Sequence, residues 1–245
     1  MEYNKLFNSE YQPSSGKYDE FVSVDRKVRA HYHLLSDQFA QYKTEHYQKF
    51  NEEAKLVFFN EGITFAVYSD NPLGSEKIFP FDFIPRIIPE KEWCTIEKGI
   101  VQRNRAINEF LKDLYHGKKI LKDGIVPKEL IYSSANMLSV MEGFDPIGGI
   151  YNHISGTDII RHSDGEYYVL EDNVRCPSGV SYVLANRNTL KKTLPHLFSK
   201  CQPQPIIDYP EKLLEMLQSV SPGNSHPNCV VLSPGMYNSA YFEHS

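Results

Sequence analysis

The spacing of apolar and polar positions along the chain predicts more helix than strand. In several stretches apolar residues recur every three or four positions, and charged residues fill the positions between them. This spacing predicts helices over residues 18–44, 45–60, 89–117, 178–194 and 211–219. Gly62 and Gly117 follow two of these stretches, as glycine often does where a helix ends. Ser178 is expected to cap the fourth helix.

Short runs of apolar, β-branched and aromatic residues predict strands between the helices. They fall at residues 63–68, 150–154 and 229–232, with two more strands between Thr157 and Gly179. Together these elements predict an α/β (mixed α+β) fold with N-terminal helices and a mixed or antiparallel central sheet. The expected organisation is an N-terminal arm with helices, a core, and the start of an incomplete βαβ subdomain, over residues 1–60, 61–200 and 201–245. The return strand of that last unit is not in the sequence, so we expect the front part of a longer protein.

The residues around Asp164–Gly165 predict a β-hairpin around which the rest of the chain is organised. Asp164–Gly165 is a strong signal for a two-residue turn between two apolar runs. With this turn, antiparallel pairing places Ile160 opposite Val169 and Asp158 opposite Glu171. A turn of three or five residues would instead shift the register by one and put the two carboxylates on opposite faces.

Three oxygen-bearing side chains are predicted to converge at the end of this hairpin away from the turn. Asp158 and Glu171 face each other, and Asn173 lies two residues beyond Glu171 on the same face. Facing carboxylates repel each other, and a bound cation would remove the repulsion. Carboxylate and amide oxygens are ligands that Mg²⁺ prefers. The alternative is that these acidic residues at strand ends are simply solvated.

Several arginines and one helix end are candidates for holding a phosphate or a substrate carboxylate. Arg175 lies beside the carboxylate cluster, and a salt bridge to Asp172 is its alternative role. Arg86 stands in an apolar segment, where an ion pair is the default role and a ligand contact is the alternative. The helix after Ser178 begins near Asn173 and presents backbone N–H groups there. The candidates for binding a cofactor are Arg86, Ser178, Gly179 and Arg187.

Composition and charge argue against several classes of function. The formal net charge of −5 argues against a general nucleic-acid binder. No apolar run approaches the roughly 18 residues that a membrane span needs, and the N-terminus does not have the pattern of a signal peptide. The four cysteines are too widely spaced for a zinc motif and suit free thiols in a reducing cytoplasm. We therefore expect a cytoplasmic protein that binds neither nucleic acid nor membrane.

Long motifs along the chain carry a resemblance to a known family. The hairpin region contributes GTDIIRHSDGEYYV followed by LEDNVRCPSGVSYVLANR. Other segments contribute PFDFIPRII, WCTIEKGIVQRNRAINEFLKDLY and VVLSPGMYNSAYFEHS. These motifs resemble the circularly permuted ATP-grasp proteins, a family related to glutathionylspermidine synthase. The resemblance covers nearly the whole chain from Tyr18 onward and implies the N-terminal half of that fold.

The resemblance implies an ATP- and Mg²⁺-dependent ligase that joins a carboxylate to an amine through an acyl phosphate. The synthase's metal ligands follow a pattern of Asp and then Glu-x-Asn. That pattern falls on Asp158, Glu171 and Asn173. The spacing is slightly longer than the pattern, which implies a different turn. An arginine of the synthase falls on Gly156 here, so Arg161 and Arg175 become the candidates to serve the chemistry.

The resemblance also implies that lysines and a glycine-rich loop for the nucleotide belong to a second half beyond Ser245. We therefore expect a small-molecule or peptide ligase that is weakly active or inactive alone. One alternative is a non-catalytic binding subunit, with a partner chain supplying the missing half. A weaker alternative is a Mg²⁺-dependent hydrolase, which would need His153 as a base because His162 is expected beside the turn.

Overall fold

The computed structural model describes residues 11, 13–67, 75–221, 223, 226–236, 238 and 241–245. The α-helices among them are α1 (His33–Phe39), α2 (Thr44–Asn60), α3 (Glu90–Tyr115), α4 (Lys119–Lys122), α5 (Lys128–Tyr132), α6 (Val180–Thr193), α7 (Pro195–Cys201), α8 (Tyr209–Ser219) and α9 (Tyr241–His244). Short 3₁₀ helices are η1 (Ala30–Tyr32), η2 (Ser139–Met141) and η3 (Ile147–Gly149). The strands form two antiparallel pairs, β1 (Thr64–Val67) with β2 (Ser75–Ile78) and β3 (Gly156–Arg161) with β4 (Tyr167–Asn173).

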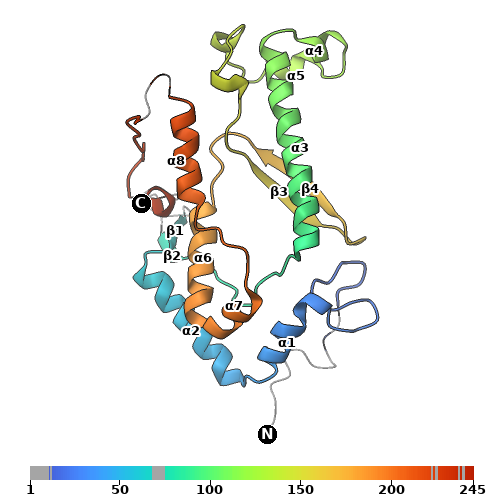
Figure 1. Cartoon of the computed structure of the whole chain (residues 1–245), viewed down its shortest axis with the longest axis vertical. Helices are drawn as coiled ribbons and strands as arrows, with labels where there is room; N and C mark the ends of the chain where they lie inside the picture. Colours follow the sequence, from blue (N-terminus) through green and yellow to red (C-terminus); the bar gives the residue numbers. More distant parts are fainter. Residues whose placement is uncertain are drawn as a thin grey trace.

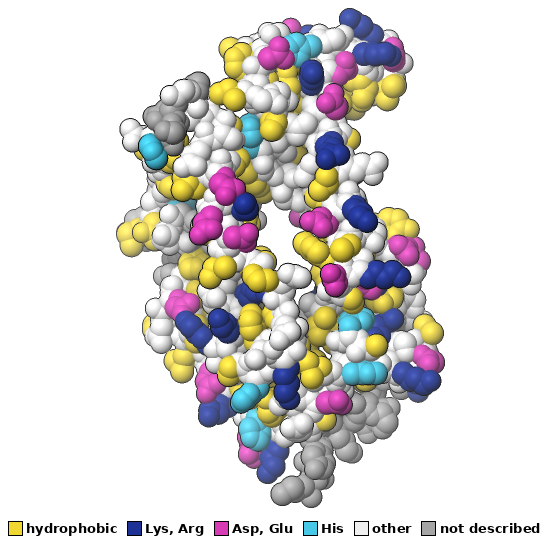
Figure 2. Space-filling view, in the orientation of Figure 1, with side chains coloured by type: hydrophobic (Ala, Val, Ile, Leu, Met, Phe, Trp, Pro, Cys, Tyr) yellow, Lys and Arg dark blue, Asp and Glu magenta, His cyan; other side chains and the backbone are white. Residues whose placement is uncertain are grey.

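The elements form two sides that meet at the end of the molecule near the N-terminus. α3 and the β3–β4 hairpin make one side, and α6 and α8 make the other (Figure 1). α1, α2 and α7 join the two sides, while α4 and α5 lie at the opposite end of α3 (Figure 1). The space-filling view shows an opening between the sides (Figure 2). The described part of the chain has far more helix than strand, and its strands form two small antiparallel sheets, which confirms the predicted mixed α/β class.

The main buried cluster lies where the two sides meet. Leu35 and Phe39 of α1 are fully buried there. They pack with Tyr47 of α2 and with Leu194 and Leu197 around the start of α7. The rings of Phe39 and Tyr47 stack with their centroids 5.5 Å apart. This cluster fixes the helices at one end of the molecule, far from the tip formed by α4 and α5 (Figure 1).

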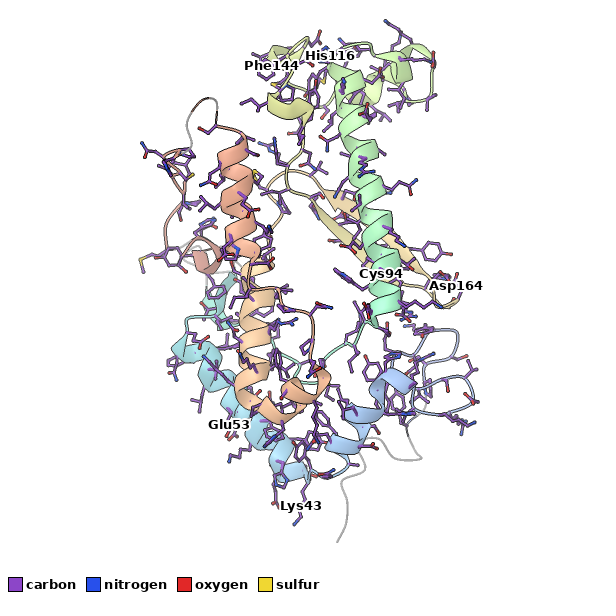
Figure 3. All side chains as sticks on the ribbon, viewed as in Figure 1. Lys43, Glu53, Cys94, His116, Phe144 and Asp164 are labelled. Carbon is purple, nitrogen blue, oxygen red and sulfur yellow. The ribbon has the colours of Figure 1, made fainter. Side chains whose placement is uncertain are left out.

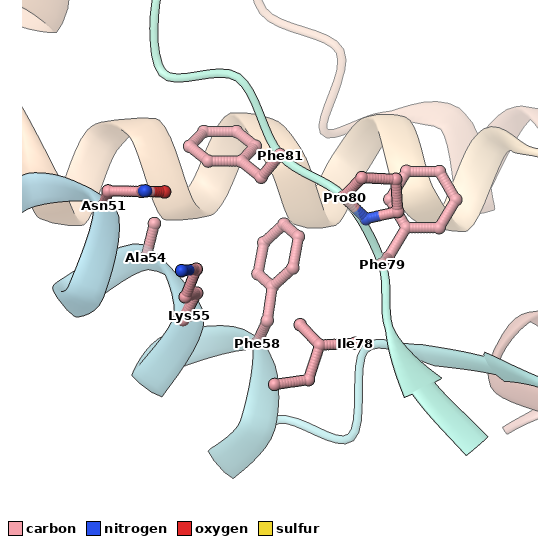
Figure 4. A pocket seen from close by; sticks show the side chains of 8 residues that line it. All are labelled: Asn51, Ala54, Lys55, Phe58, Ile78, Phe79, Pro80 and Phe81. Atoms are coloured by element: carbon pink, nitrogen blue, oxygen red, sulfur yellow. The ribbon is translucent and has the colours of Figure 1, made fainter. Parts of the chain in front are cut away.

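A second, smaller cluster joins α2 to the first strand pair and to α6. Phe58 and Ile63 are fully buried in it, and Ala185 of α6 packs against them. A pocket of about 160 Å³ lies beside Phe58 (Figure 4). Its lining is formed by Asn51, Ala54, Lys55, Phe58, Ile78, Phe79, Pro80 and Phe81. Three of these side chains are aromatic, and one of them, Phe58, belongs to the buried cluster, so the pocket lies at the edge of that cluster.

The long helices agree with the sequence predictions. α2, α3, α6 and α8 all lie within two residues of the expected ends. Pro89 precedes the first turn of α3, where its fixed φ suits the start of a helix. Gly62 follows α2 with φ at +65°, the left-handed conformation that glycine adopts without strain. None of the helices in the described part of the chain is long and apolar enough to cross a membrane.

The helix predicted over residues 18–44 is wrong for its first half. The Asp19 carboxylate accepts the N–H groups of Phe21 and Val22, at 2.9 and 2.7 Å. Val22 then forms an isolated antiparallel bridge with Val28. A side chain that satisfies nearby backbone donors offers the chain an alternative to the helix. The helix therefore begins only at η1 and α1.

The strand predicted over residues 150–154 is also wrong. The Asn108 Oδ1 atom of α3 accepts the N–H groups of Tyr151 and Asn152, at 2.7 and 3.0 Å. Asn108 Nδ2 donates in return to the Asn152 carbonyl oxygen at 3.2 Å. This segment therefore obtains its backbone partners from one helical side chain and needs no neighbouring strand.

The strand predicted over residues 229–232 is not formed, so the expected start of a βαβ unit is wrong in this respect. These residues have no regular secondary structure and are exposed. Most of the predicted N-terminal arm falls outside the described residues. The run at 63–68 is confirmed as β1 for Thr64–Val67.

Candidate functional site

The β3–β4 hairpin keeps the predicted pairing at its open end and departs from it beside the turn. Asp158 pairs with Glu171, as predicted. Ile160 pairs with Tyr168 and not with Val169, so this part of the predicted register is wrong. The two halves of the hairpin therefore differ in register by one residue.

The turn and a bulge explain this difference. The His162 N–H donates to the Glu166 carbonyl oxygen and the Gly165 N–H to the His162 carbonyl oxygen, both at 2.9 Å. Residues 163–165 therefore form a three-residue loop, with Gly165 in the left-handed conformation at φ 86°. A β-bulge at Leu170, which has no partner on β3, shifts the pairing back. The two irregularities cancel, and the two carboxylates stay on one face.

One face of the hairpin packs on α3 through an arginine. Arg161, whose side chain is 9% exposed, donates from its two terminal nitrogens to Glu92 at 2.8 and 2.9 Å. Its guanidinium also lies 3.3 Å from Glu20. The rings of Tyr18 and Tyr167 lie over the same group, with centroids 4.1 and 4.7 Å from its central carbon. Arg161 therefore ties the N-terminal loop, α3 and the hairpin together.

Burial and pairing shift the titration of this cluster. Burial raises the pKa of Glu92, but hydrogen bonds from Arg161 and Tyr167 and the charge of Arg161 outweigh it, and the pKa lies below its ordinary value. Burial raises the pKa of Tyr167, and the hydrogen bond that its hydroxyl donates to Glu92 raises it further. At neutral pH Glu92 is therefore ionised and Tyr167 protonated, as the contacts to Arg161 require.

Asp172 makes a second contact between this face and α3. Arg103 Nε donates to Asp172 Oδ2 at 2.6 Å, and the Thr157 hydroxyl donates to Oδ1 at 3.0 Å. The alternative in which Arg175 pairs with Asp172 is wrong, because Arg103 takes that position. Arg175 is exposed and donates to Asn136 Oδ1 at 2.8 Å.

The other face of the hairpin carries the predicted metal ligands. Asp158, Glu171 and Asn173 are all exposed. Asn173 Nδ2 donates to Glu171 Oε1 at 3.3 Å, which places the two side chains together. Within the described part of the chain, the Asp158 side chain has no hydrogen bond or ion pair, and the Glu171 side chain has no cationic partner. The structure therefore brings the three residues together and leaves two facing carboxylates without a neutralising group.

The chemistry of these side chains fits a divalent cation. Two facing carboxylates repel each other, and a cation between them would remove the repulsion. The Asn173 amide donates to Glu171 through its nitrogen, so its oxygen is left as an acceptor. No group of three or more His, Cys, Asp or Glu gathers among the described residues. Mg²⁺ suits such a sparse set, because it usually keeps several water or phosphate oxygens as ligands.

The remaining cationic candidates contact other parts of the chain. Arg86 Nε lies 4.0 Å from Glu20, so the ion pair expected as its default is present but long. Arg187 donates to the Gln204 carbonyl oxygen and lies 5.5 Å from the ring centroid of Phe198. Arg161 lies on the opposite face of the hairpin from the metal candidates. The structure does not bring these three arginines to the carboxylate pair.

The turn of the hairpin lies away from the carboxylate pair. His162 Nδ1 is 3.5 Å from Asp164 Oδ2, so His162 lies beside the turn as predicted. In Figure 3 the labels of Asp164 and Cys94 lie toward the same end of α3, with His116 and Phe144 at the opposite end of that helix. The hairpin therefore runs along α3, with Arg161 beside Glu92 and Asp172 beside Arg103.

The N-cap position of the helix after the hairpin lies one residue later than predicted. Gly179 with φ 107° precedes the first turn of α6, and no side chain caps it, so the cap predicted at Ser178 is wrong. The Gly179 N–H donates to Glu243 Oε2 of α9 at 2.6 Å. The position predicted to take an anion therefore holds a carboxylate of the chain itself. Cofactor binding by Ser178 and Gly179 stays a prediction.

Gly156 marks the start of β3, where two backbone segments approach closely. A Cβ atom at position 156 would lie 2.9 Å from the Pro177 Cβ and 3.7 Å from the Asn173 Cβ. The first distance is shorter than real contacts between such atoms. A larger residue at position 156 would therefore displace Pro177, which lies on the segment that leads from the metal candidates to α6.

The predictions from sequence missed the residues of α3 that hold the hairpin. Glu92 and Arg103 stand three helical turns apart on the face that also carries the buried Ile96. Asn104, one residue further on, accepts a hydrogen bond from the Ser155 hydroxyl at 2.7 Å. The sequence did contain a signal for these contacts. Charged and amide residues that interrupt an apolar stripe of a helix indicate partners elsewhere in the fold, because such groups are rarely buried without them.

Comparisons with known proteins place these features in a family. A family model described as circularly permuted ATP-grasp type 2 matches residues 85–245, which is more than half of the chain. An uncharacterised protein of Synechocystis is 45% identical over 229 residues, covering 93% of this chain and 47% of the relative. An uncharacterised protein of Mycobacterium leprae is 38% identical over 229 residues, covering 93% of this chain and 40% of the relative.

A more distant relative carries a name that refers to an activity. This protein of Frankia casuarinae, whose name provisionally calls it glutamate–cysteine ligase 2-2, is 32% identical over 239 residues. The match covers 96% of this chain and 27% of the relative. The chain therefore spans less than half the length of each of these three relatives.

Proposed function

We propose that this chain, which belongs to the circularly permuted ATP-grasp type 2 family, is the metal-binding part of an ATP- and Mg²⁺-dependent ligase that joins a carboxylate to an amine. The observation that carries the proposal is the facing pair of Asp158 and Glu171, which has no neutralising partner among the described residues. A closer relationship to glutathionylspermidine synthase, and a cytoplasmic location, are parts of the same proposal.

In this proposal Asp158, Glu171 and Asn173 hold Mg²⁺ through their oxygen atoms. When bound, the ion would supply charge neutralisation to the phosphate oxygens of ATP. Two contacts with α3, of Arg161 with Glu92 and of Asp172 with Arg103, hold the opposite face of the hairpin, so the ligands stay in place. We therefore assign Arg161 a positioning role, in place of the direct role considered from sequence.

Arg175 is the arginine that we propose for a substrate carboxylate or phosphate. It lies two residues beyond Asn173 and is exposed. One nitrogen of its guanidinium donates to Asn136, and the other N–H groups remain available to an anion. The nucleotide phosphates are proposed to meet the backbone N–H groups at Ser178 and Gly179, which requires Glu243 to move away. Arg86 and Arg187 are further candidates for anion contacts.

The proposal is tested with Mg²⁺·ATP, glutamate and a panel of amines, by measuring ADP and the amide product. We expect ADP release that requires Mg²⁺ and both substrates, and that falls at least about tenfold in Glu171→Gln. The rate from this chain alone is expected to be low, because the chain spans less than half of its relatives. The Mg²⁺-dependent rise in Tm is therefore measured on the same proteins.

Three results would contradict the proposal. Equal rates in wild type and Glu171→Gln, together with an equal Mg²⁺ effect on Tm, would remove the metal site. Phosphate release without any amide product would favour the hydrolase alternative. The third result is intact Mg²⁺ binding with no ADP formation. If this holds both for the chain alone and for the chain mixed with the remaining part of a relative, it would favour the non-catalytic binding subunit.

A further inference from the structure

A cavity of about 430 Å³ lies where the N-terminal loop and η1 meet the segment that leads into α3. This volume falls in the range of pockets that hold small molecules, which is roughly 300–1,000 Å³. Its lining consists of four apolar or aromatic residues and three charged ones. A mainly apolar wall with a few charged groups is typical of a site for a small organic ligand.

The apolar wall of this cavity is fixed by contacts within the chain. The rings of Phe21 and Tyr32 meet edge to face, with their centroids 5.4 Å apart. Tyr32 is 3% exposed, and its hydroxyl accepts the Ile87 N–H at 2.9 Å. Ile84 and Pro85, both half-buried, complete the wall. The wall is therefore in place before any ligand binds.

Two charged side chains at this cavity have bonding capacity to spare. Asp82 Oδ1 accepts the Ile84 N–H at 2.9 Å, whereas its Oδ2 atom has no partner among the described residues. Arg86 Nε lies 4.0 Å from Glu20, which is longer than a hydrogen bond. Within the described part of the chain, the terminal nitrogens of Arg86 have no partner. The cavity therefore presents one available cation and one available anion.

The third charged residue, Glu20, is shared between two arginines. Its Oε2 atom accepts a hydrogen bond from Arg161 at 3.3 Å, and its Oε1 atom faces Arg86. Because Arg161 has Glu92 as its closer partner, Glu20 is neutralised only in part. Its Oε1 atom can therefore take part in holding a second cationic group.

These groups together select a ligand that carries both charges. A carboxylate suits the fork of Arg86, and an ammonium group suits Asp82 and Glu20. An amine alone would leave Arg86 without an anion, and an acid alone would leave Asp82 without a cation. We propose that this cavity binds an α-amino acid with a large apolar side chain, which lies against the rings of Phe21 and Tyr32. The 4.0 Å between Glu20 and Arg86 suits an α-amino acid, because a single carbon atom separates its ammonium and carboxylate groups.

This cavity is separate from the proposed metal site. Glu20 reaches the hairpin at Arg161, and Asp158 lies three residues back along β3, about 10 Å away at the usual rise of a strand. Binding is therefore expected without Mg²⁺ or ATP. The inference gives the anion contact of Arg86 a specific partner, and it does not rest on ligase activity. Its failure is distinguishable from failure of the ligase proposal, which is read from Mg²⁺-dependent ADP release and from Glu171→Gln.

The test is a titration of the whole chain with L-phenylalanine, without Mg²⁺ and ATP, followed by ¹H–¹⁵N NMR. We expect a dissociation constant of about 1 mM or below, which is within reach of a ligand of this size. Two analogues separate the charges, since 3-phenylpropionate has no ammonium and phenethylamine has no carboxylate. Each analogue should bind at least about tenfold more weakly than L-phenylalanine. Glycine should bind more weakly still than L-phenylalanine because it has no side chain to meet the apolar wall.

Two conservative variants assign each charge of the ligand to one residue. Arg86→Gln should weaken L-phenylalanine at least about tenfold and leave phenethylamine unchanged. Asp82→Asn should weaken L-phenylalanine and leave 3-phenylpropionate unchanged, and its amide oxygen can still accept the Ile84 N–H. The matched controls are Arg105→Gln and Asp37→Asn, at exposed positions outside the lining, and both should bind like wild type. Because Asp82 and Arg86 are exposed, neither variant should unfold the chain.

Several results would overturn the proposal. One is the absence of saturable binding of L-phenylalanine at concentrations up to about 10 mM. Another is equal affinity for L-phenylalanine and phenethylamine, which would make the cavity a site for amines. Equal affinity for L-phenylalanine and 3-phenylpropionate would make it a site for anions. Equal weakening by Arg86→Gln and Arg105→Gln would place the binding elsewhere on the chain.

Discussion

The two faces of the β3–β4 hairpin treat charge in opposite ways. On the face toward α3, Arg161 pairs with Glu92 and Asp172 pairs with Arg103. On the open face, Asp158 and Glu171 stand opposite each other without such partners in the described structure. Charges that the protein neutralises itself serve the fold, whereas charges that it leaves facing one another are available to a ligand. Substitutions on the two faces should therefore differ in what they change.

The largest effect on stability is expected at the Arg161–Glu92 pair. Glu92→Gln would leave the guanidinium of Arg161, 9% exposed, without its bidentate partner. We expect a loss of about 2–3 kcal/mol in the free energy of unfolding, measured by urea denaturation. The Mg²⁺-dependent rise in Tm should remain as in wild type. A loss below about 0.5 kcal/mol would show that Glu20 replaces Glu92 as the partner.

The same pair predicts a dependence on pH. The pKa of Glu92 is lower in the folded chain than its ordinary value, so its contribution to stability is present above the ordinary pKa. That contribution disappears as the pH falls through the lowered pKa. Wild type should therefore lose stability on acidification more steeply than Glu92→Gln. Parallel stability–pH curves for the two proteins would contradict this.

The next largest effect on stability is expected at Asp158, on the face of the hairpin that carries the two facing carboxylates. The substitution should lower stability in the presence of Mg²⁺ and raise it in its absence. Asp158→Asn should remove the Mg²⁺-dependent stabilisation, which for a bound ligand at 100 times its Kd is about 2.7 kcal/mol. Without Mg²⁺ the variant should be more stable than wild type by about 0.2–1 kcal/mol, because a repulsion between facing carboxylates is lost. Thermal unfolding with Mg²⁺ and with EDTA measures both. A full Mg²⁺ response in Asp158→Asn would refute the site.

A smaller effect is expected at Asp172, which is the matched control for Asp158. Asp172→Asn weakens the contact to Arg103, whose side chain is 45% exposed and therefore screened by solvent. We expect a loss of about 1 kcal/mol at most, measured by urea denaturation, with the Mg²⁺ response unchanged. A lost Mg²⁺ response would mean that the two faces are not independent.

The smallest effect on stability is expected at Arg175, which is exposed and held by one hydrogen bond to Asn136. Arg175→Met should change the free energy of unfolding by less than about 0.5 kcal/mol. In a preparation with ligase activity, either the chain alone or the chain with the remaining part of a relative, Arg175→Met should raise the KM for the anionic substrate. Arg175→Lys should restore part of the affinity. An unchanged KM in Arg175→Met would remove Arg175 from the proposed site.

The sequence predicts the long helices well because their signals are local. Pro89 and Gly62 mark helix ends through their own backbone preferences. The errors arise where a distant or polar side chain decides the backbone. Asn108 supplies partners to a segment more than 40 positions away, and Asp19 holds a turn in place of a helix. Apolar spacing contains no information about such contacts.

The candidate site was predictable only in part for a related reason. The pairing of Asp158 with Glu171 follows from counting along the hairpin, although the count assumed the wrong turn. The roles of Arg161 and Arg175 depend on which face of the hairpin each side chain lies on and on which residues of α3 lie against that face. Arg103 and Glu92 determine that outcome, and neither lies in the hairpin.

The loop at residues 163–165 and the bulge at Leu170 restrict which insertions and deletions the hairpin tolerates. Deleting one residue from the loop alone would slide β4 against β3 and turn the carboxylates away from each other. Deleting Leu170 alone would do the same from the other end. Either change becomes tolerable only with the other, so an alignment to a relative with a shorter turn should need two gaps. Length variation here is expected to occur in compensated pairs.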